Sequence, residues 1–287
     1  MEQVSIIIPA FNEEKSIKEV IQKIQNTLSS LNIEYEIIVI DDCSADNTLK
    51  RVEELKDIKV IRHSKNSGYG AALKTGIKNS KYETLIITDA DGTYPDNIIP
   101  SLIEHSNNHD MVVGARTGED VNIAFIRKPA KWFLNKLANY LVQEKIPDLN
   151  SGLRLLKKQI VKNYLGILPS GFSFTTTITL AMHSDGYNIK YIPINYYKRT
   201  GKSKIRPIRD TLNFVQLIIR TILLFNPLRV FNPISFSLFL LAVVKITYDI
   251  LKYNFHISGS SIVILIVAFQ TFLLGYLADL IVTTRKK

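Results

Sequence analysis

Short apolar runs alternate with helical periodicity along the first 115 residues of the chain. Five runs are nearly continuous in apolar character, as expected for strands buried on both faces of a sheet: residues 4–9, 36–41, 58–62, 84–89 and 111–114. Between the first two, apolar residues recur at helical spacing from Ile17 to Leu31, with Asn12 as the expected N-cap. This alternation predicts an α/β fold with a mainly parallel sheet covered by helices.

A second amphipathic stretch covers residues 125–142, where Leu137, Ala138 and Leu141 share one side. The simplest interpretation is a helix packed on the core. Its basic residues leave a role facing an acceptor or a membrane open. A further α+β stretch ends near Tyr197, after which the composition becomes basic and then apolar.

Two C-terminal segments, residues 233–251 and 262–282, approach the length of about 20 residues that a helix needs to cross a bilayer. A polar turn joins them, which predicts a helical hairpin. Residues 208–229 form an amphipathic pattern typical of a helix in the membrane interface. The predicted domains are therefore a catalytic domain at 1–205, an interfacial helix region at 206–231, and a transmembrane hairpin with a basic tail at 232–287.

The distribution of basic residues predicts how the hairpin is oriented in a membrane. The net charge is +10, and residues 198–229 carry eight Lys or Arg against one acid, Asp210. Because basic residues flank both outer ends of the hairpin, the catalytic domain and both termini are expected on the cytoplasmic side of a membrane. Anionic lipid headgroups are the expected contact of the basic stretch, and nucleic acid is not expected because no recognised nucleic-acid module accompanies it. The single cysteine, Cys43, agrees with a reducing compartment.

Lys245 and Asp249 lie four residues apart within the first apolar segment. Charges inside a membrane segment suggest function, but these two side chains can also pair along one helix face. A homo-oligomer with Lys245 at a partner contact is left open.

The most specific chemical signal is Asp89-Ala90-Asp91, at the end of an apolar strand. Two carboxylates two residues apart can converge on a hard divalent cation, Mg²⁺ or Mn²⁺, which in turn neutralises a diphosphate. Parallel sheets place ligand sites at the carboxyl ends of their strands, so the location fits. A turn that needs Asp and Gly would look similar when taken alone.

Three other polar turns are expected at the same edge of the sheet: residues 9–13, 41–44 and 66–71. Carboxylates such as Asp41 and Glu13 can accept hydrogen bonds from a base or ribose, and Gly68 and Gly70 allow a ligand to approach the backbone. A dinucleotide-binding motif is excluded, because the glycine pair lacks the third glycine and does not open the first βα unit.

These motifs, in this order, resemble those of the family 2 glycosyltransferases of the GT-A fold, and specifically the polyprenyl-phosphate sugar transferase branch that includes dolichyl-phosphate mannose synthases. The resemblance spans almost the whole chain. It rests on residues 9–13, 41–44, 66–68, 89–92, 113–116, 148–154, 199–204 and 275–281.

The resemblance implies roles for individual residues. The nucleotide and donor site would comprise Pro9, Phe11, Glu13, Asp41, Asp42, Asn66, Gly68, Asp89 and Ala90. Asp89 and Asp91 would bind the metal. The catalytic set would be Asp91, Arg116, Arg127, Arg199 and Lys204, with Arg116 and Arg127 at the acceptor phosphate and the last two closing over the phosphates. Mannose synthases often have Gln where this chain has Thr93, which leaves a third metal-contacting side chain and a mannose donor open.

The reaction implied is transfer of a sugar from a nucleotide-diphosphate sugar, of the GDP-mannose or UDP-glucose type, to dolichyl or undecaprenyl phosphate, with inversion. A phosphate monoester is largely dianionic at neutral pH, because its second pKa is about 6, so no catalytic base is nominated. Two alternatives stay open: a nonprocessive transferase with another lipid or glycan acceptor, and a catalytically inactive membrane scaffold. A processive synthase is disfavoured, because no Gln-x-x-Arg-Trp motif occurs.

Overall fold

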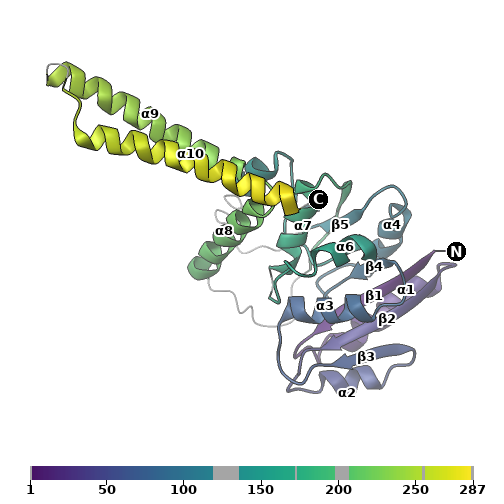
Figure 1. Cartoon of the computed structure of the whole chain (residues 1–287). Helices are drawn as coiled ribbons and strands as arrows, with labels where there is room; N and C mark the ends of the chain where they lie inside the picture. Colours follow the sequence, from purple (N-terminus) through teal and green to yellow (C-terminus); the bar gives the residue numbers. More distant parts are fainter. Residues whose placement is uncertain (1, 119–135, 172, 198–206, 254–255, 286–287) are drawn as a thin grey trace.

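The computed structural model describes residues 2–118, 136–171, 173–197, 207–253 and 256–285. Its centre is a seven-stranded sheet in the order β3-β2-β1-β4-β6-β5-β7 (Figure 1). The strands are β1 Gln3–Ala10, β2 Glu34–Asp41, β3 Ile58–Arg62, β4 Thr84–Ile87, β5 Met111–Ala115, β6 Arg154–Lys157 and β7 Ile189–Pro193. The predicted α/β class is therefore confirmed.

One strand runs against the others. β1 pairs in parallel with β2 and β4, β2 with β3, and β5 with β7, whereas β6 is antiparallel to both β4 and β5. The amino end of β6 consequently meets the carboxyl ends of its two neighbours. This geometry adds residues 148–153, which precede β6, to the edge where the polar turns gather.

Helices cover both faces of the sheet. Apolar residues of α1, α2 and α4 pack with one face and those of α3, α6 and α7 with the other, because the strands are apolar on both sides. The bounds are α1 Ile17–Ser29, α2 Thr48–Glu53, α3 Tyr69–Asn79, α4 Ile99–Glu104, α6 Lys158–Tyr164 and α7 Phe174–Ser184, with a 3-10 turn, η1, at Asp96–Ile98.

Two predicted boundaries differ from the structure. β4 ends at Ile87, so Asp89 lies in the following turn rather than in the strand. The N-cap of α1 is Ser16 and not Asn12, which has a φ of 58° and belongs to the turn after β1. Asn tolerates this left-handed conformation because its short polar side chain can hydrogen-bond to the nearby backbone. The same hydrogen-bonding ability is the reason that the sequence suggested Asn12 as an N-cap.

The helix that precedes the hairpin, α8 (Pro207–Leu223), packs on the α/β domain. Ile218 and Ile222 are fully buried in a cluster with Leu180 of α7 and the apolar residues of 138–149. Residues 136–142 are helical, and Ala138 and Leu141 face this cluster as the periodicity predicted. The amphipathic pattern of α8 thus reflects, at least in its second half, burial against protein.

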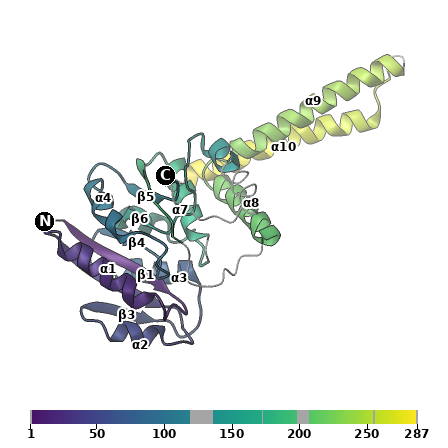
Figure 2. The same cartoon turned by 180° about the vertical axis from the view of Figure 1, so that it is seen from behind.

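The two C-terminal helices, α9 (Leu228–Lys252) and α10 (Gly259–Arg285), form a hairpin that projects from the α/β domain (Figures 1 and 2). Both helices are long and apolar enough to span a membrane, and only 17% of the most apolar part of each is buried inside the protein. The end of α10 returns to the domain from which α9 departs (Figure 2).

A polar cluster closes the turn of the hairpin. Asp249 accepts hydrogen bonds from the backbone N–H of Ser258 at 3.0 Å and from the Ser261 hydroxyl at 2.5 Å. Lys245 Nζ lies 3.6 Å from Asp249 Oδ1, so these residues pair along one helix face as the sequence suggested. Because Ser258 directly precedes α10, the Asp249 carboxylate satisfies a donor at the start of that helix and holds the two helices together.

Helix α3 packs closely on the sheet at Gly76, and a substitution at this residue tests how close the packing is. A Cβ at Gly76 would collide with Ile7 and would lie 2.8 Å from Ile40 Cδ1, both in the sheet, whereas a Cβ at Gly166 would meet nothing within 4 Å. Overpacking of this kind costs about 1–3 kcal/mol. We therefore expect Gly76→Val to lower the melting temperature of the detergent-purified chain by several degrees, at about 2–4 °C per kcal/mol. Gly166→Val is the control, and equal melting temperatures for the two variants would contradict the packing described.

Candidate active site

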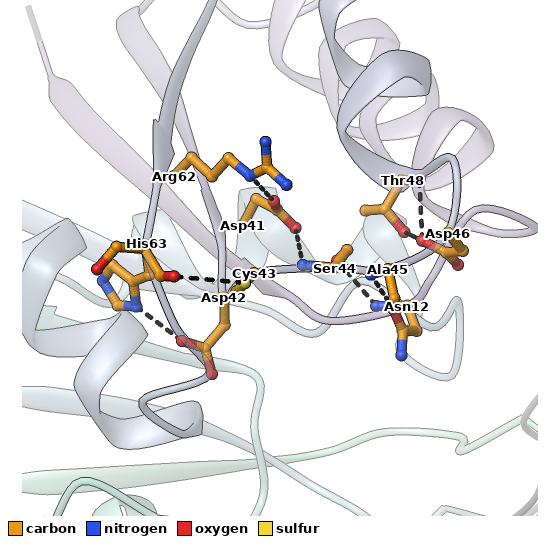
Figure 3. A network of polar contacts seen from close by, with 11 residues as sticks. Asn12, Asp41, Asp42, Cys43, Ser44, Ala45, Asp46, Thr48, Arg62 and His63 are labelled. Atoms are coloured by element: carbon orange, nitrogen blue, oxygen red, sulfur yellow. Dashed lines mark hydrogen bonds and ion pairs between the residues drawn. The ribbon is translucent and has the colours of Figure 1, made fainter.

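The turns after β1 and β2 are joined by hydrogen bonds. The Asn12 backbone N–H donates to Ser44 Oγ at 3.0 Å, and Asn12 Oδ1 accepts from the Ala45 backbone N–H at 2.8 Å (Figure 3). The Glu13 backbone N–H donates to Thr48 Oγ1 at 2.8 Å. These bonds fix the turn that carries Phe11 and Glu13 against the turn that carries Asp41.

Asp41, the last residue of β2, presents a buried carboxylate that is only partly satisfied. Its side chain is 1% exposed, and Oδ1 accepts from the Ser44 backbone N–H at 3.1 Å. Oδ2 accepts no hydrogen bond from the described residues, although Arg62 Nε lies 3.4 Å away (Figure 3). A buried acceptor without a donor is costly, so this oxygen is suited to an N–H or O–H of a ligand.

Asp42 organises the neighbouring turn. Its carboxylate accepts from the backbone N–H groups of Ser67 at 2.8 Å and Gly68 at 2.7 Å, and His63 Nδ1 lies 2.7 Å from Oδ1 (Figure 3). Three partners within the protein indicate that Asp42 positions the start of α3. The sequence assigned Asp42 to the donor site, and in the structure its carboxylate holds the turn before α3.

Gly68 and Gly70 are required by close contacts with the protein itself, whereas the sequence attributed them to the approach of a ligand. Gly68 has a φ of 98°, and a Cβ there would lie 2.6 Å from the carbonyl oxygen of Ser170. A Cβ at Gly70 would overlap the carbonyl oxygen of Pro169. The Ala71 backbone N–H donates to Ser170 at 3.0 Å, which closes this contact. Asn66, beside this turn, is exposed.

Asp89 lies in the turn after β4 and is held by residues that come from distant parts of the chain. The Tyr69 hydroxyl donates to Asp89 Oδ1 at 2.9 Å. Burial and the Asp89 charge raise the pKa of Tyr69, so its hydroxyl stays protonated and remains a donor. Gly152 packs so closely on Asp89 that a Cβ would lie 2.7 Å from Oδ2, and its own N–H donates to the Tyr94 hydroxyl at 2.6 Å.

Asp91 is 8% exposed and is held from within its own turn. Its Oδ1 accepts from the Thr93 hydroxyl at 2.7 Å and from the Thr93 backbone N–H at 3.2 Å. A cavity of about 560 Å³ opens beside Asp89 and Asp91. It is bounded by Lys15, which precedes α1, by one side of α1 that includes Lys23, by η1 and by Tyr197.

The pair Asp89 and Asp91 fits a divalent cation that is completed by a substrate. Among the described residues, no group of three or more His, Cys, Asp or Glu side chains could hold a metal ion. Mg²⁺ is commonly bound by one or two carboxylates together with water and substrate phosphates, and Mn²⁺ favours the same oxygen ligands. The donor set therefore suits a cation shared with a diphosphate rather than a permanent protein cage.

Arg116, directly after β5, forms a bidentate ion pair. Its Nε and a terminal nitrogen donate to the two oxygens of Asp148 at 2.7 and 2.8 Å, and Asp148 is fully buried. Burial works to lower the pKa of Arg116, but the bonds to Asp148 outweigh it and raise that pKa. The guanidinium also lies 5.1 Å from the Tyr196 ring centroid. Its predicted contact with an acceptor phosphate would have to be made alongside this pair.

Arg154, the first residue of β6, is a fully buried cation behind the site. It donates to the Ser151 and Thr175 carbonyls and to the Thr179 hydroxyl, and burial lowers its pKa. No carboxylate of the described residues accepts a hydrogen bond from it. Its charge therefore contributes a positive potential beneath an edge that is rich in carboxylates.

The structure brings most of the predicted residues to one edge of the sheet. Pro9 and Ala90 are buried beside the turns that carry Phe11, Glu13, Asp89 and Asp91. Arg127, Arg199 and Lys204 fall outside the described residues. The sequence analysis gave no role to Tyr69, Tyr94 and Gly152. The feature that could have drawn attention to Tyr69 is its position between Gly68 and Gly70.

Two relatives found by comparison with known proteins carry a polyprenyl phosphate in their names. A dolichol-phosphate mannosyltransferase from Pyrococcus furiosus is 34% identical over 215 residues, which cover 71% of this chain and 59% of that protein. An undecaprenyl-phosphate 4-deoxy-4-formamido-L-arabinose transferase from Pseudomonas fluorescens is 28% identical over 254 residues, which cover 82% and 69%. The chain thus spans less than two thirds of the Pyrococcus protein.

Solved structures support the fold. Glucosyl-3-phosphoglycerate synthase from Mycobacterium tuberculosis, in complex with Mn²⁺, uridine diphosphate and phosphoglyceric acid, matches with a TM-score of 0.60 at 18% identity, over 77% of each chain. Residues 226–284 match the family model described as the GtrB C-terminal hairpin. Residues 5–165 match the model of glycosyl transferase family 2, and the chain belongs to that family.

Proposed function

We propose that this enzyme transfers a sugar from a nucleotide-diphosphate sugar to a polyprenyl phosphate, with inversion and with a divalent cation. The observation that carries the proposal is that Asp41, Asp89 and Asp91 lie at the same edge of the sheet. The chain that carries them belongs to glycosyl transferase family 2 and has a C-terminal hairpin of two apolar helices. The two relatives described above are named for polyprenyl-phosphate acceptors.

The donor would lie along this edge. The unsatisfied Oδ2 of Asp41 offers an acceptor to the base or ribose of the nucleotide. Asp89 and Asp91 would hold Mg²⁺ or Mn²⁺, which when bound neutralises diphosphate charge and stabilises the leaving nucleoside diphosphate. Lys15 and Lys23, at the border of the adjacent cavity, add positive charge nearby.

The acceptor needs positioning more than activation. A phosphate monoester is already nucleophilic at neutral pH, so the protein has to align its oxygen with the anomeric carbon. Arg116, held rigidly by Asp148, and Arg127 are the proposed contacts for that phosphate. Arg199 and Lys204 are proposed to close over the phosphates.

The hairpin base is joined to this acceptor side through a short stretch of chain. Arg229, in the first turn of α9, donates to the carbonyl of Leu141 at 2.7 Å and to Gln143 Oε1 at 3.0 Å. Asp148, which holds Arg116, follows seven residues after Leu141. A lipid phosphate delivered at the base of the hairpin would therefore reach the stretch of chain that holds Arg116. By the charge distribution, the domain and both termini are proposed to face the cytoplasm.

The reaction is tested by incubating detergent-purified protein with Mg²⁺ or Mn²⁺, a polyprenyl phosphate and a panel of UDP- and GDP-sugars, with mass spectrometry of the lipid fraction. We expect one glycolipid from one donor, which names the sugar. Donor hydrolysis or binding without glycolipid would contradict the lipid acceptor and favour another lipid or glycan acceptor. If no nucleotide sugar binds, an inactive scaffold becomes the better interpretation.

Removal of the cation should stop transfer. Because only two carboxylates and a diphosphate would hold the metal, we expect EDTA to abolish product formation and excess Mg²⁺ or Mn²⁺ to restore it. The melting temperature without nucleotide should change little, since the cation would not hold the fold together. Undiminished transfer in EDTA would show that the reaction does not need a metal.

Asp91→Ala should reduce transfer to background, because it removes one of the two carboxylates while the hairpin is unchanged. Glu104→Ala is the control, since Glu104 is an exposed acid on α4, away from the site. Transfer and recovery in the membrane fraction are measured for both variants. Full activity of Asp91→Ala would overturn the metal assignment, and loss from the membrane would show that the change acts on folding.

A further inference from the structure

Thr93 lies two residues after Asp91 and its side chain is completely buried. An ionised carboxylate can only accept, so the hydroxyl, 2.7 Å from Asp91 Oδ1, donates its proton to that oxygen. The backbone N–H of Thr93 donates to the same atom at 3.2 Å. Thr93 therefore donates to Oδ1 twice, through its side chain and through its backbone.

The carbonyl group of Thr93 connects this turn to another part of the site. It accepts a hydrogen bond from the Tyr197 backbone N–H at 3.0 Å. Tyr197 borders the cavity beside Asp89 and Asp91. Its neighbour Tyr196 packs edge-on to Tyr94, with ring centroids 5.3 Å apart, and lies against Arg116. Thr93 thus ties the Asp91 turn to the segment that packs on Arg116.

We propose that Thr93 is a positioning residue that fixes the Asp91 carboxylate for a divalent cation, a role that rests on the proposed metal-dependent function. Groups that hydrogen-bond to ligating carboxylates orient them, and losing such a group typically costs about 10–100-fold in metal affinity or activity. Thr93 acts through Asp91, since its buried hydroxyl is already committed to that carboxylate.

Two substitutions separate the hydroxyl from the methyl group of Thr93. Thr93→Val keeps the shape and the stiff χ1 of a β-branched side chain but removes the donor. Thr93→Ser keeps the donor and removes the methyl group. A hydrogen-bonding role and a packing role therefore predict opposite rankings of the two variants.

The primary measurement is the Kd for Mn²⁺, obtained from the electron paramagnetic resonance signal of free Mn²⁺ with detergent-purified full-length protein and a saturating nucleoside diphosphate. We expect Thr93→Val to raise that Kd by about 10-fold or more and Thr93→Ser to remain close to the unsubstituted protein. Transfer by Thr93→Val should need correspondingly more Mn²⁺. Melting temperatures without metal report separately on folding.

Asp91→Ala serves as the reference for loss of the site. If Asp91→Ala loses Mn²⁺ binding while Thr93→Val retains it, the role of Thr93 is overturned and the proposed function stands. A raised Kd for Thr93→Ser with an unchanged Kd for Thr93→Val would also overturn it, in favour of packing. If Asp91→Ala binds Mn²⁺ as well as the unsubstituted protein, the metal assignment fails and the role of Thr93 fails with it.

Discussion

The site depends on satisfying several carboxylates that are largely buried at one edge of a sheet. Asp41, Asp42, Asp91 and Asp148 are each less than 9% exposed. Taking a carboxylate out of water is costly unless hydrogen bonds or an ion pair satisfy it. The protein gives the carboxylates different partners: backbone N–H groups for Asp42, a guanidinium for Asp148, a hydroxyl and an N–H for Asp91. The buried cation of Arg154 adds a positive potential behind them.

These carboxylates differ in how many hydrogen bonds the protein gives them, and this difference distinguishes structural carboxylates from those available to a ligand. Asp42 and Asp148 have partners on both oxygens, and each holds a backbone segment or side chain in place. Asp41 keeps one buried oxygen without a hydrogen bond from the described residues. Scaffold carboxylates stabilise the edge without a substrate, and an unsatisfied one is stabilised further when a donor binds. The sequence does not distinguish the structural carboxylates, such as Asp42 and Asp148, from the unsatisfied Asp41.

The sequence predicted the parts of the fold that local pattern determines. All five apolar runs became strands, and the position of Asp89 and Asp91 followed from the rule for parallel sheets. Contacts between distant segments were not predictable from local pattern. β6 lies antiparallel between β4 and β5 and brings Gly152 to Asp89, and the 169–171 turn occupies the space beside Gly68 and Gly70. A close approach by protein needs the same residue as a close approach by ligand, so the sequence could not show that these glycines pack on the 169–171 turn.

The hairpin and the site are connected by packing as well as by sequence. α8 buries Ile218 and Ile222 against α7 and residues 138–149, while Arg229 holds the end of the 136–142 helix. The same stretch continues to Asp148, whose ion pair fixes Arg116. A hairpin attached through a flexible linker would leave the distance between membrane and site undefined. This buried attachment defines the position of Arg116 relative to the base of the hairpin, which the proposed lipid-bound acceptor would require because its phosphate could not diffuse away from the membrane surface.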